Sequence, residues 1–159
     1  MPIDCRRLDP NDAEAYAALR AEMIVAETDA FLGAPGDDAF CDPQRVRTTL
    51  ASPDQAIFGA FDGPAPVAVA GVYREPRLKR RHIAAIWGVY TKPSHRGQGL
   101  SRALLTMCFR HVGGWEGVDV IQLSAAETSA PAMRRHESLG FETWGREPHG
   151  TRVNGRSIT

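Results

Sequence analysis

Three apolar segments in the middle of the chain predict neighbouring β-strands. They cover residues 55–61, 66–73 and 82–91, and the turn Asp62-Gly63-Pro64 and a later basic turn separate them. Turn residues at this short spacing favour antiparallel hairpins. Three further strands are predicted from shorter apolar runs at 3–8, at 118–123, which is short enough for a buried strand, and at 141–145.

Between these strands, apolar residues recur at helical spacing in four segments. The first helix carries Leu19, Met23 and Ala26 on one face, and Asn11 or Asp12 precedes it as an N-cap. The other helices are predicted at 43–50, from 100 to the Gly113-Gly114 pair, and at 129–138.

The order of elements, βααβββαβαβ, predicts an α/β layer structure around one mixed sheet. No repeat or linker divides the 159 residues, so we expect a single domain over 1–159. The stretch 27–43 has no period and is rich in Gly, Pro and Asp. Irregular stretches of this length in a compact domain are usually functional or mobile.

Charge and composition exclude several classes of function. The 19 Lys and Arg balance 19 Asp and Glu, so no cationic excess is present for bulk nucleic-acid binding. No apolar run approaches the roughly 20 residues that cross a bilayer, and we find no signal peptide. Three distant cysteines form no disulfide framework, which is typical of a reducing compartment. We expect a cytoplasmic domain that binds neither nucleic acid nor membrane.

The segment from Val89 to Ser101 carries the most specific chemistry. A strand enters the turn Arg96-Gly97-Gln98-Gly99, and the turn opens a helix. The first amides of a helix lack intrahelical partners and carry the positive end of its dipole, and glycines let an anion approach them. A plain connecting turn is the simpler interpretation of two glycines alone. The dinucleotide fingerprint fails at Arg102, and the Gly-Lys-Ser/Thr of a P-loop is absent.

Residues Arg96-Gly97-Gln98-Gly99-Leu100-Ser101 resemble the motif R/Q-x-x-G-x-G/A with which GNAT N-acetyltransferases bind the pyrophosphate of acyl-CoA. The apolar strand before the turn, Pro93 and the apolar helix after it also match. Ser101 departs from the Gly or Ala of the family, but it is small and keeps its backbone N–H.

A second family motif, N-x-x-A-x-x-x-Y-E-x-x-G-F, is similar to residues 129–141. Ser129 replaces its Asn and His136 replaces its Tyr. Because two motifs in the right order are much rarer by chance than one, the chain is identified as a member of the superfamily over about 55–145. The motif residues that are kept are Ala132, Glu137, Gly140 and Phe141.

The resemblance implies the GNAT fold: a mostly antiparallel sheet, splayed at one parallel strand pair and flanked by helices, with an acyl-CoA-binding core at about 82–145. Gly88 lies where the splayed strand would bulge, although a simple Trp87-Gly88 packing pair is the alternative. Acetyl-CoA is then the cosubstrate, without a metal, and a primary amine of a small molecule or peptide is the acceptor. The residues expected to bind the acyl-CoA are Val89, Tyr90, Thr91, Arg96, Gly97, Gln98, Gly99, Leu100, Ser101, Ser129, Ala132 and His136.

The resemblance also implies direct attack of the amine on the thioester. A backbone N–H near Val89 would donate to the developing oxyanion. His136 would be the general acid that protonates the leaving thiolate, because an imidazole can donate a proton near neutral pH. A semi-buried His without a catalytic role is the equally plain alternative. Ser129 would hydrogen-bond the pantetheine or cap its helix.

The sequence does not assign a general base. Glu127, Glu22 and His82 are candidates, and a solvated surface residue is the simpler interpretation of each. The loop 31–40, with Asp37 and Asp38, could face a cationic amine. A basic cluster is either a solvated turn or a contact for an anionic substrate or the CoA 3′-phosphate, and it consists of Arg74, Arg77, Lys79, Arg80 and Arg81.

Two other functions compete with catalysis. The departures at Ser101, Ser129 and His136 leave open an acyl-CoA-binding or regulatory module of the same fold without efficient turnover. A general phosphate-binding protein is a third interpretation. Zinc sites and nucleophilic triads have no support, because HExxH and GxSxG are absent and Cys108 falls on an apolar helix face.

The end of the chain predicts an oligomer. After residue 145 only the short polar tail 151–159 is available for the last antiparallel strand of the family, so we expect this strand to be brief, truncated or supplied by a partner chain. A brief last strand leaves an exposed sheet edge, which favours pairing with a second subunit. We therefore predict a homodimer, measured by light scattering of the purified protein; a monomeric mass would contradict it.

Overall fold

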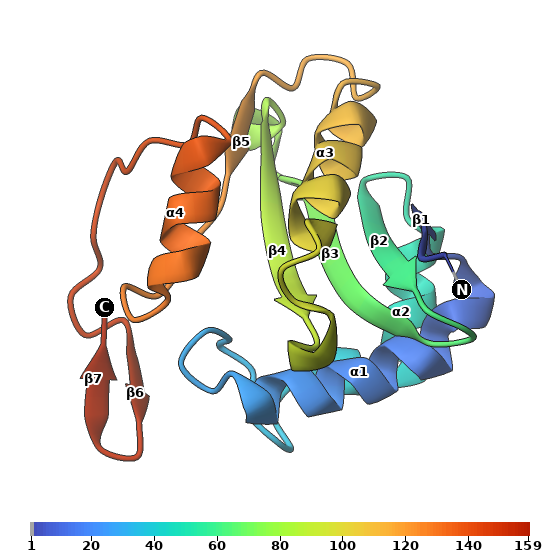
Figure 1. The fold of residues 1–159 in the computed structure, drawn as a ribbon. Coiled ribbons are helices and arrows are strands. Elements are labelled where there is room, and N and C mark those ends of the chain that lie inside the picture. The colour runs from blue at the N-terminus through green and yellow to red at the C-terminus, as the bar shows by residue number, and fades with distance from the viewer. Residues whose placement is uncertain (1) are drawn as a thin grey trace.

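One five-stranded sheet, in the order β1-β2-β3-β4-β5, organises the computed structural model, which describes residues 2–159 (Figure 1). The first four strands pair antiparallel, and β4 pairs parallel with β5. This confirms the α/β class and the mostly antiparallel sheet with one parallel pair. The strands are β1 (Asp4–Arg7), β2 (Gln55–Phe61), β3 (Pro66–Arg74), β4 (Ile83–Thr91) and β5 (Val120–Gln122).

Four α-helices accompany the sheet: α1 (Ala13–Ala26), α2 (Pro43–Ala51), α3 (Leu100–Val112) and α4 (Ala130–Ser138). They cover both faces, because successive strand residues point to opposite sides. Ile57 and Val69 pack with α1 and α2, whereas Phe58 and Ala70 pack with α3. Figure 1 shows α4 beside the far end of the sheet, next to β4 and β5.

The predicted strand at 141–145 is wrong. This segment has no regular structure, and its Trp144 is 85% exposed. An isolated strand needs a neighbour for its backbone hydrogen bonds, and β5 has already ended at Gln122. The chain instead ends in a separate hairpin of β6 (Thr151–Val153) and β7 (Arg156–Ile158), outside the main sheet.

Two details of other elements also differ from expectation. The strand predicted at 118–123 shrinks to three residues, and it is half-exposed rather than buried because it forms the edge of the sheet. Ala26 is exposed, since the buried face of α1 is centred on Tyr16 and Met23.

The start of α1 is capped differently from the prediction. Asp12 makes no side-chain capping bond to α1, because its carboxylate accepts hydrogen bonds from Arg6 and from the Asp9 amide. Asp9 caps the preceding 3-10 turn, Pro10–Asp12, in its place.

An extra residue in β4 interrupts its regular pairing. Between the pairs Val69–Tyr90 and Gly71–Trp87, one residue of β3 faces two of β4. Gly88 lies in this bulge with a φ of 61°, a backbone conformation that residues with a side chain rarely adopt. The parallel pairing with β5 ends before this point. The predicted bulge is therefore confirmed, and the two parallel strands separate beyond their first residues.

A buried ion pair holds the irregular stretch after α1 against that helix. Arg20 donates to Asp38 Oδ2 from Nε at 3.0 Å and from Nη2 at 2.7 Å, and the two side chains are only 9% and 4% exposed. Asp38 is therefore not open to a cationic amine. The guanidinium also lies 5.3–5.8 Å from the ring centroids of Phe31, Phe40 and Trp87.

Within residues 2–159, the structure contains no helix with the length and apolar character needed to cross a bilayer.

We predict that Asp38→Ala lowers the free energy of unfolding by about 3–5 kcal/mol, because it leaves the Arg20 charge buried and unpaired. Urea denaturation measures the effect. Asp29→Ala is the matched control: Asp29 lies in the same stretch and pairs with Arg156 at 3.2 Å, a 61% exposed partner, so its loss should cost about 0–1 kcal/mol. Equal effects of the two substitutions would contradict the structural role of the buried pair.

Candidate active site

The turn between β4 and α3 presents unpartnered backbone amides. Ala103 is the first residue of α3 whose amide has a backbone partner, the Gly99 carbonyl at 3.0 Å. Within the described residues, the amides from Gly97 to Arg102 have no hydrogen-bond acceptor. Six free donors at the positive end of a helix form a site for an anion such as a pyrophosphate.

The two glycines of the turn shape this site. Gly97 and Gly99 have φ values of 78° and 75°, and a Cβ built on either would have no neighbour within 4 Å. The open space beside them is therefore available to a ligand. Ser101 turns its hydroxyl to Thr91 Oγ1 at 2.8 Å, so this departure from the motif ties the strand to the helix instead of filling the turn.

A cleft of about 720 Å³ begins at the turn and runs between the end of β4 and α4. It brings together most of the residues predicted to bind acyl-CoA. Gln98 is the one turn residue that does not line it, and His136 lies in the adjoining cavity. The predicted residues in the cleft are Val89, Tyr90, Thr91, Arg96, Gly97, Gly99, Leu100, Ser101, Ser129 and Ala132.

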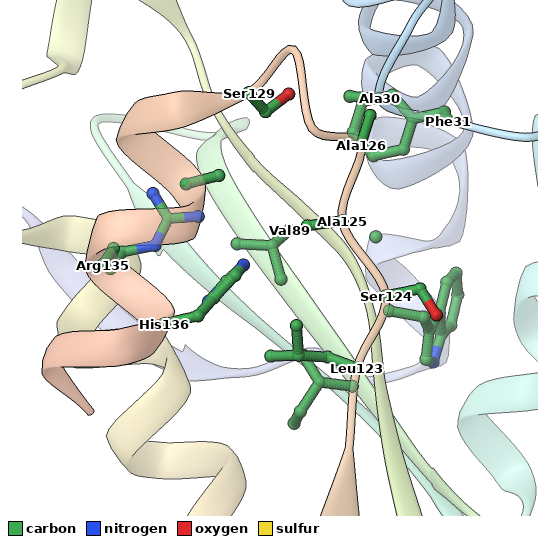
Figure 2. Close-up of a pocket in the computed structure, with 14 residues that line it drawn as sticks. Ala30, Phe31, Val89, Leu123, Ser124, Ala125, Ala126, Ser129, Arg135 and His136 are labelled. Carbon is green, nitrogen blue, oxygen red and sulfur yellow. The ribbon is translucent and has the colours of Figure 1, made fainter. Parts of the chain in front are cut away.

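A smaller cavity of about 90 Å³ continues this cleft where β4 and β5 separate. We call it the inner cavity. Figure 2 shows the ring of His136 directed from α4 toward Val89, with Leu123 and Ser124 of the segment after β5 nearby. The bulge thus places the backbone of Val89, which has no register partner in β3, opposite the imidazole. The cavity is lined by residues 30–31, 86–89, 123–126, Ser129, Ala132, Arg135 and His136.

His136 is 7% exposed, and its Nδ1 atom is buried without a hydrogen-bond partner. Removal from water disfavours the imidazolium, and the neighbouring Arg135 charge adds to this, so the pKa of His136 falls to about 4. The ring is therefore neutral at neutral pH. Ser129 also keeps its hydroxyl free, because it makes no capping hydrogen bond to α4.

Arg135 lines both the cleft and the inner cavity, and the sequence motifs gave no indication of it. It occupies an undefined position of the second motif. Helical spacing is the one signal in the sequence that could have predicted its position, because Arg135 lies three residues after Ala132 and therefore on the same face of the helix. Burial lowers the pKa of this arginine, and its Nε atom has no hydrogen-bond partner.

None of the three candidate bases lines either cavity. Glu127 forms a bidentate ion pair with Arg146, and this hydrogen bonding lowers the pKa of the Glu127 carboxyl. Glu22 is exposed and pairs with Lys92 at 3.3 Å. His82 is exposed at the opposite end of β4 from the bulge.

The basic cluster around residues 74–81 also lies away from the cleft, just before the start of β4. Arg81 pairs with Asp54 at 2.8 Å and Arg80 with Glu75 at 3.6 Å. These contacts favour the solvated turn over a contact with CoA.

Comparison with known proteins agrees with this geometry. The model of the Acetyltransferase (GNAT) family matches residues 17–141. A mycothiol acetyltransferase from Thermobispora bispora is 37% identical over 62 residues, which are 39% of this chain and 21% of that protein. The matched segment therefore spans about a fifth of that relative's length.

Solved structures share the fold at low sequence identity. The protein yncA from Salmonella typhimurium, solved with its cofactor acetyl-CoA, superposes with a TM-score of 0.84 at 20% identity, covering 99% of this chain and 90% of that one. An aminoglycoside acetyltransferase from an uncultured soil metagenomic sample, in complex with sisomicin, has a TM-score of 0.68 at 16% identity, with 95% of each chain covered. Because the family model spans most of the chain, this protein belongs to the GNAT family of acetyltransferases.

Proposed function

We propose that the protein transfers an acetyl group from acetyl-CoA to the primary amine of a small molecule or peptide. The observation that carries this proposal is the run of six unpartnered amides from Gly97 to Arg102, which opens onto the cleft. Membership of the acetyltransferase family and the acetyl-CoA in the structure of yncA support the same cosubstrate.

In this proposal a neutral amine attacks the thioester carbon, and the tetrahedral intermediate expels the CoA thiolate. The turn amides hold the pyrophosphate of the cosubstrate. The Val89 N–H, on the bulged part of β4, donates to the developing oxyanion. His136 faces the same cavity and delivers a proton to the leaving thiolate.

The wall of the inner cavity favours an acceptor with an apolar group next to its amine. Phe31 and Trp87 line it, and no carboxylate does. An aminoglycoside carries several amines, and sites for such polycations need anionic side chains, because a buried cation requires a partner. We infer that the acceptor is a monoamine, unlike the aminoglycosides of the metagenomic neighbour.

Thiol release from acetyl-CoA across a panel of amines tests this function. We expect release with arylalkylamines and with peptides that begin with an apolar residue, and at least about tenfold less with sisomicin, a difference of about 1.4 kcal/mol in transition-state binding. The alternative, a CoA-binding module without efficient turnover, rests on the changed motif residues Ser129 and His136. Binding of CoA without thiol release for any amine would favour that module.

The pyrophosphate turn has its own test. We predict that Gly99→Ala weakens CoA binding about tenfold in calorimetry, because the added Cβ occupies the open space beside the turn amides. Gly155→Ala is the matched control, since Gly155 has a similar φ of 76° and equally open surroundings but lies in the β6–β7 turn. Equal affinities of the two variants would count against the site.

A further inference from the structure

The inner cavity contains one side chain that can accept a proton at neutral pH. Among the residues that line it, only Arg135 and His136 are titratable. An arginine stays protonated in proteins, and the hydroxyls of Ser124 and Ser129 are poor bases. A base for the attacking amine must lie within hydrogen-bond reach of its proton, directly or through one water. His136 therefore has no competitor inside the cavity.

Carboxylates near the cleft are engaged in ion pairs. Asp38 binds Arg20, and Glu127 binds Arg146. Glu27 does line the cleft, but it pairs with Arg96 at the pyrophosphate end. None of these carboxylates lines the inner cavity, where the thioester would lie.

The surroundings of His136 keep its ring neutral. Arg135 is the charged group that faces it from its own helix. The elements packed against it are β4 at 86–89, the segment 123–126 and residues 30–31, and none of these lining residues is ionisable. A neutral imidazole has a lone pair on one nitrogen and an N–H on the other, so the His136 ring can accept a proton or donate one.

We propose that His136 is a proton relay that serves first as the base and then as the acid of the same turnover. This inference rests on the proposed acetyl transfer. When the C–N bond forms, the imidazole takes a proton from the ammonium nitrogen of the tetrahedral intermediate. When the C–S bond breaks, the imidazolium gives that proton to the thiolate. The amine thus becomes an amide and the thiolate a thiol, and no further reactant is required.

The protonation state of the ring in the acetyl-CoA complex separates a relay from a simple acid. A relay must begin each turnover neutral, whereas a simple acid must begin as the imidazolium. NMR of ¹⁵N-histidine-labelled protein with acetyl-CoA, assigned with His136→Ala, measures this state directly. We expect a neutral His136 ring at neutral pH, and an imidazolium there would overturn the relay whatever the turnover rate.

Kinetics of three proteins on one reactive amine complete the test. His136→Ala should lower kcat by about 10²–10⁴-fold, a much larger effect than its effect on the affinity for CoA in calorimetry. Added imidazole should restore part of the rate, and pyrrole, a ring of similar size without a basic nitrogen, should not. His136→Tyr, which restores the family's acid but not a base of useful pKa, should stay at least about tenfold below the parent protein.

The outcomes distinguish the two proposals. A parent protein that acetylates no amine contradicts the proposed function. A parent protein that turns over, while His136→Ala or His136→Tyr keeps its full rate, contradicts the relay alone. Equal rescue by imidazole and pyrrole would show that the ring only fills space, and it too overturns the relay.

Discussion

The rest of the site depends on one extra residue in β4. A β-bulge bends its strand and disrupts the local pairing, and beyond the β4–β5 pairs, which end at Ala85 and Gln122, the bulge at Gly88 directs the second half of β4 away from β5. The separation opens the inner cavity and leaves Val89 without a register partner. It also constrains the neighbouring strand, because a Cβ on Gly71 would lie 2.5 Å from the Trp87 ring. The inner cavity and the close packing of Trp87 against Gly71 therefore both follow from the bulge in β4.

The Arg20–Asp38 pair stabilises the wall of the inner cavity that Phe31 and Trp87 form. Its guanidinium lies beside Phe31 and Trp87, and both of these side chains line the inner cavity. Burial of two charges costs several kcal/mol, which their mutual attraction offsets only when the geometry is good. The two hydrogen bonds to one carboxylate oxygen meet this condition. The irregular stretch after α1, which includes the short 3-10 helix Ala39–Cys41, thus gains a fixed position next to the inner cavity.

Ser124, Ser129, Arg135 and His136 bring polar side-chain groups into a cavity whose other walls are largely apolar. An unpartnered buried donor or acceptor costs about 1–3 kcal/mol, and His136 retains one in Nδ1. The same desolvation disfavours the imidazolium and keeps the ring neutral at neutral pH, so burial here changes the protonation state of the residue as well as its solvation.

The sequence alone determined the local features of this protein: the strand periods, the glycine-rich turn, the helix that follows it, and the motif positions of Ser129 and His136. These depend on residues close together in the chain, where spacing and backbone preference suffice. Only the tertiary structure decided that 141–145 finds no partner strand and that Glu127 is occupied by Arg146. It alone places the lone proton acceptor opposite Val89. Pairing, burial and charge compensation involve residues distant in the chain, and local patterns do not record which of them meet.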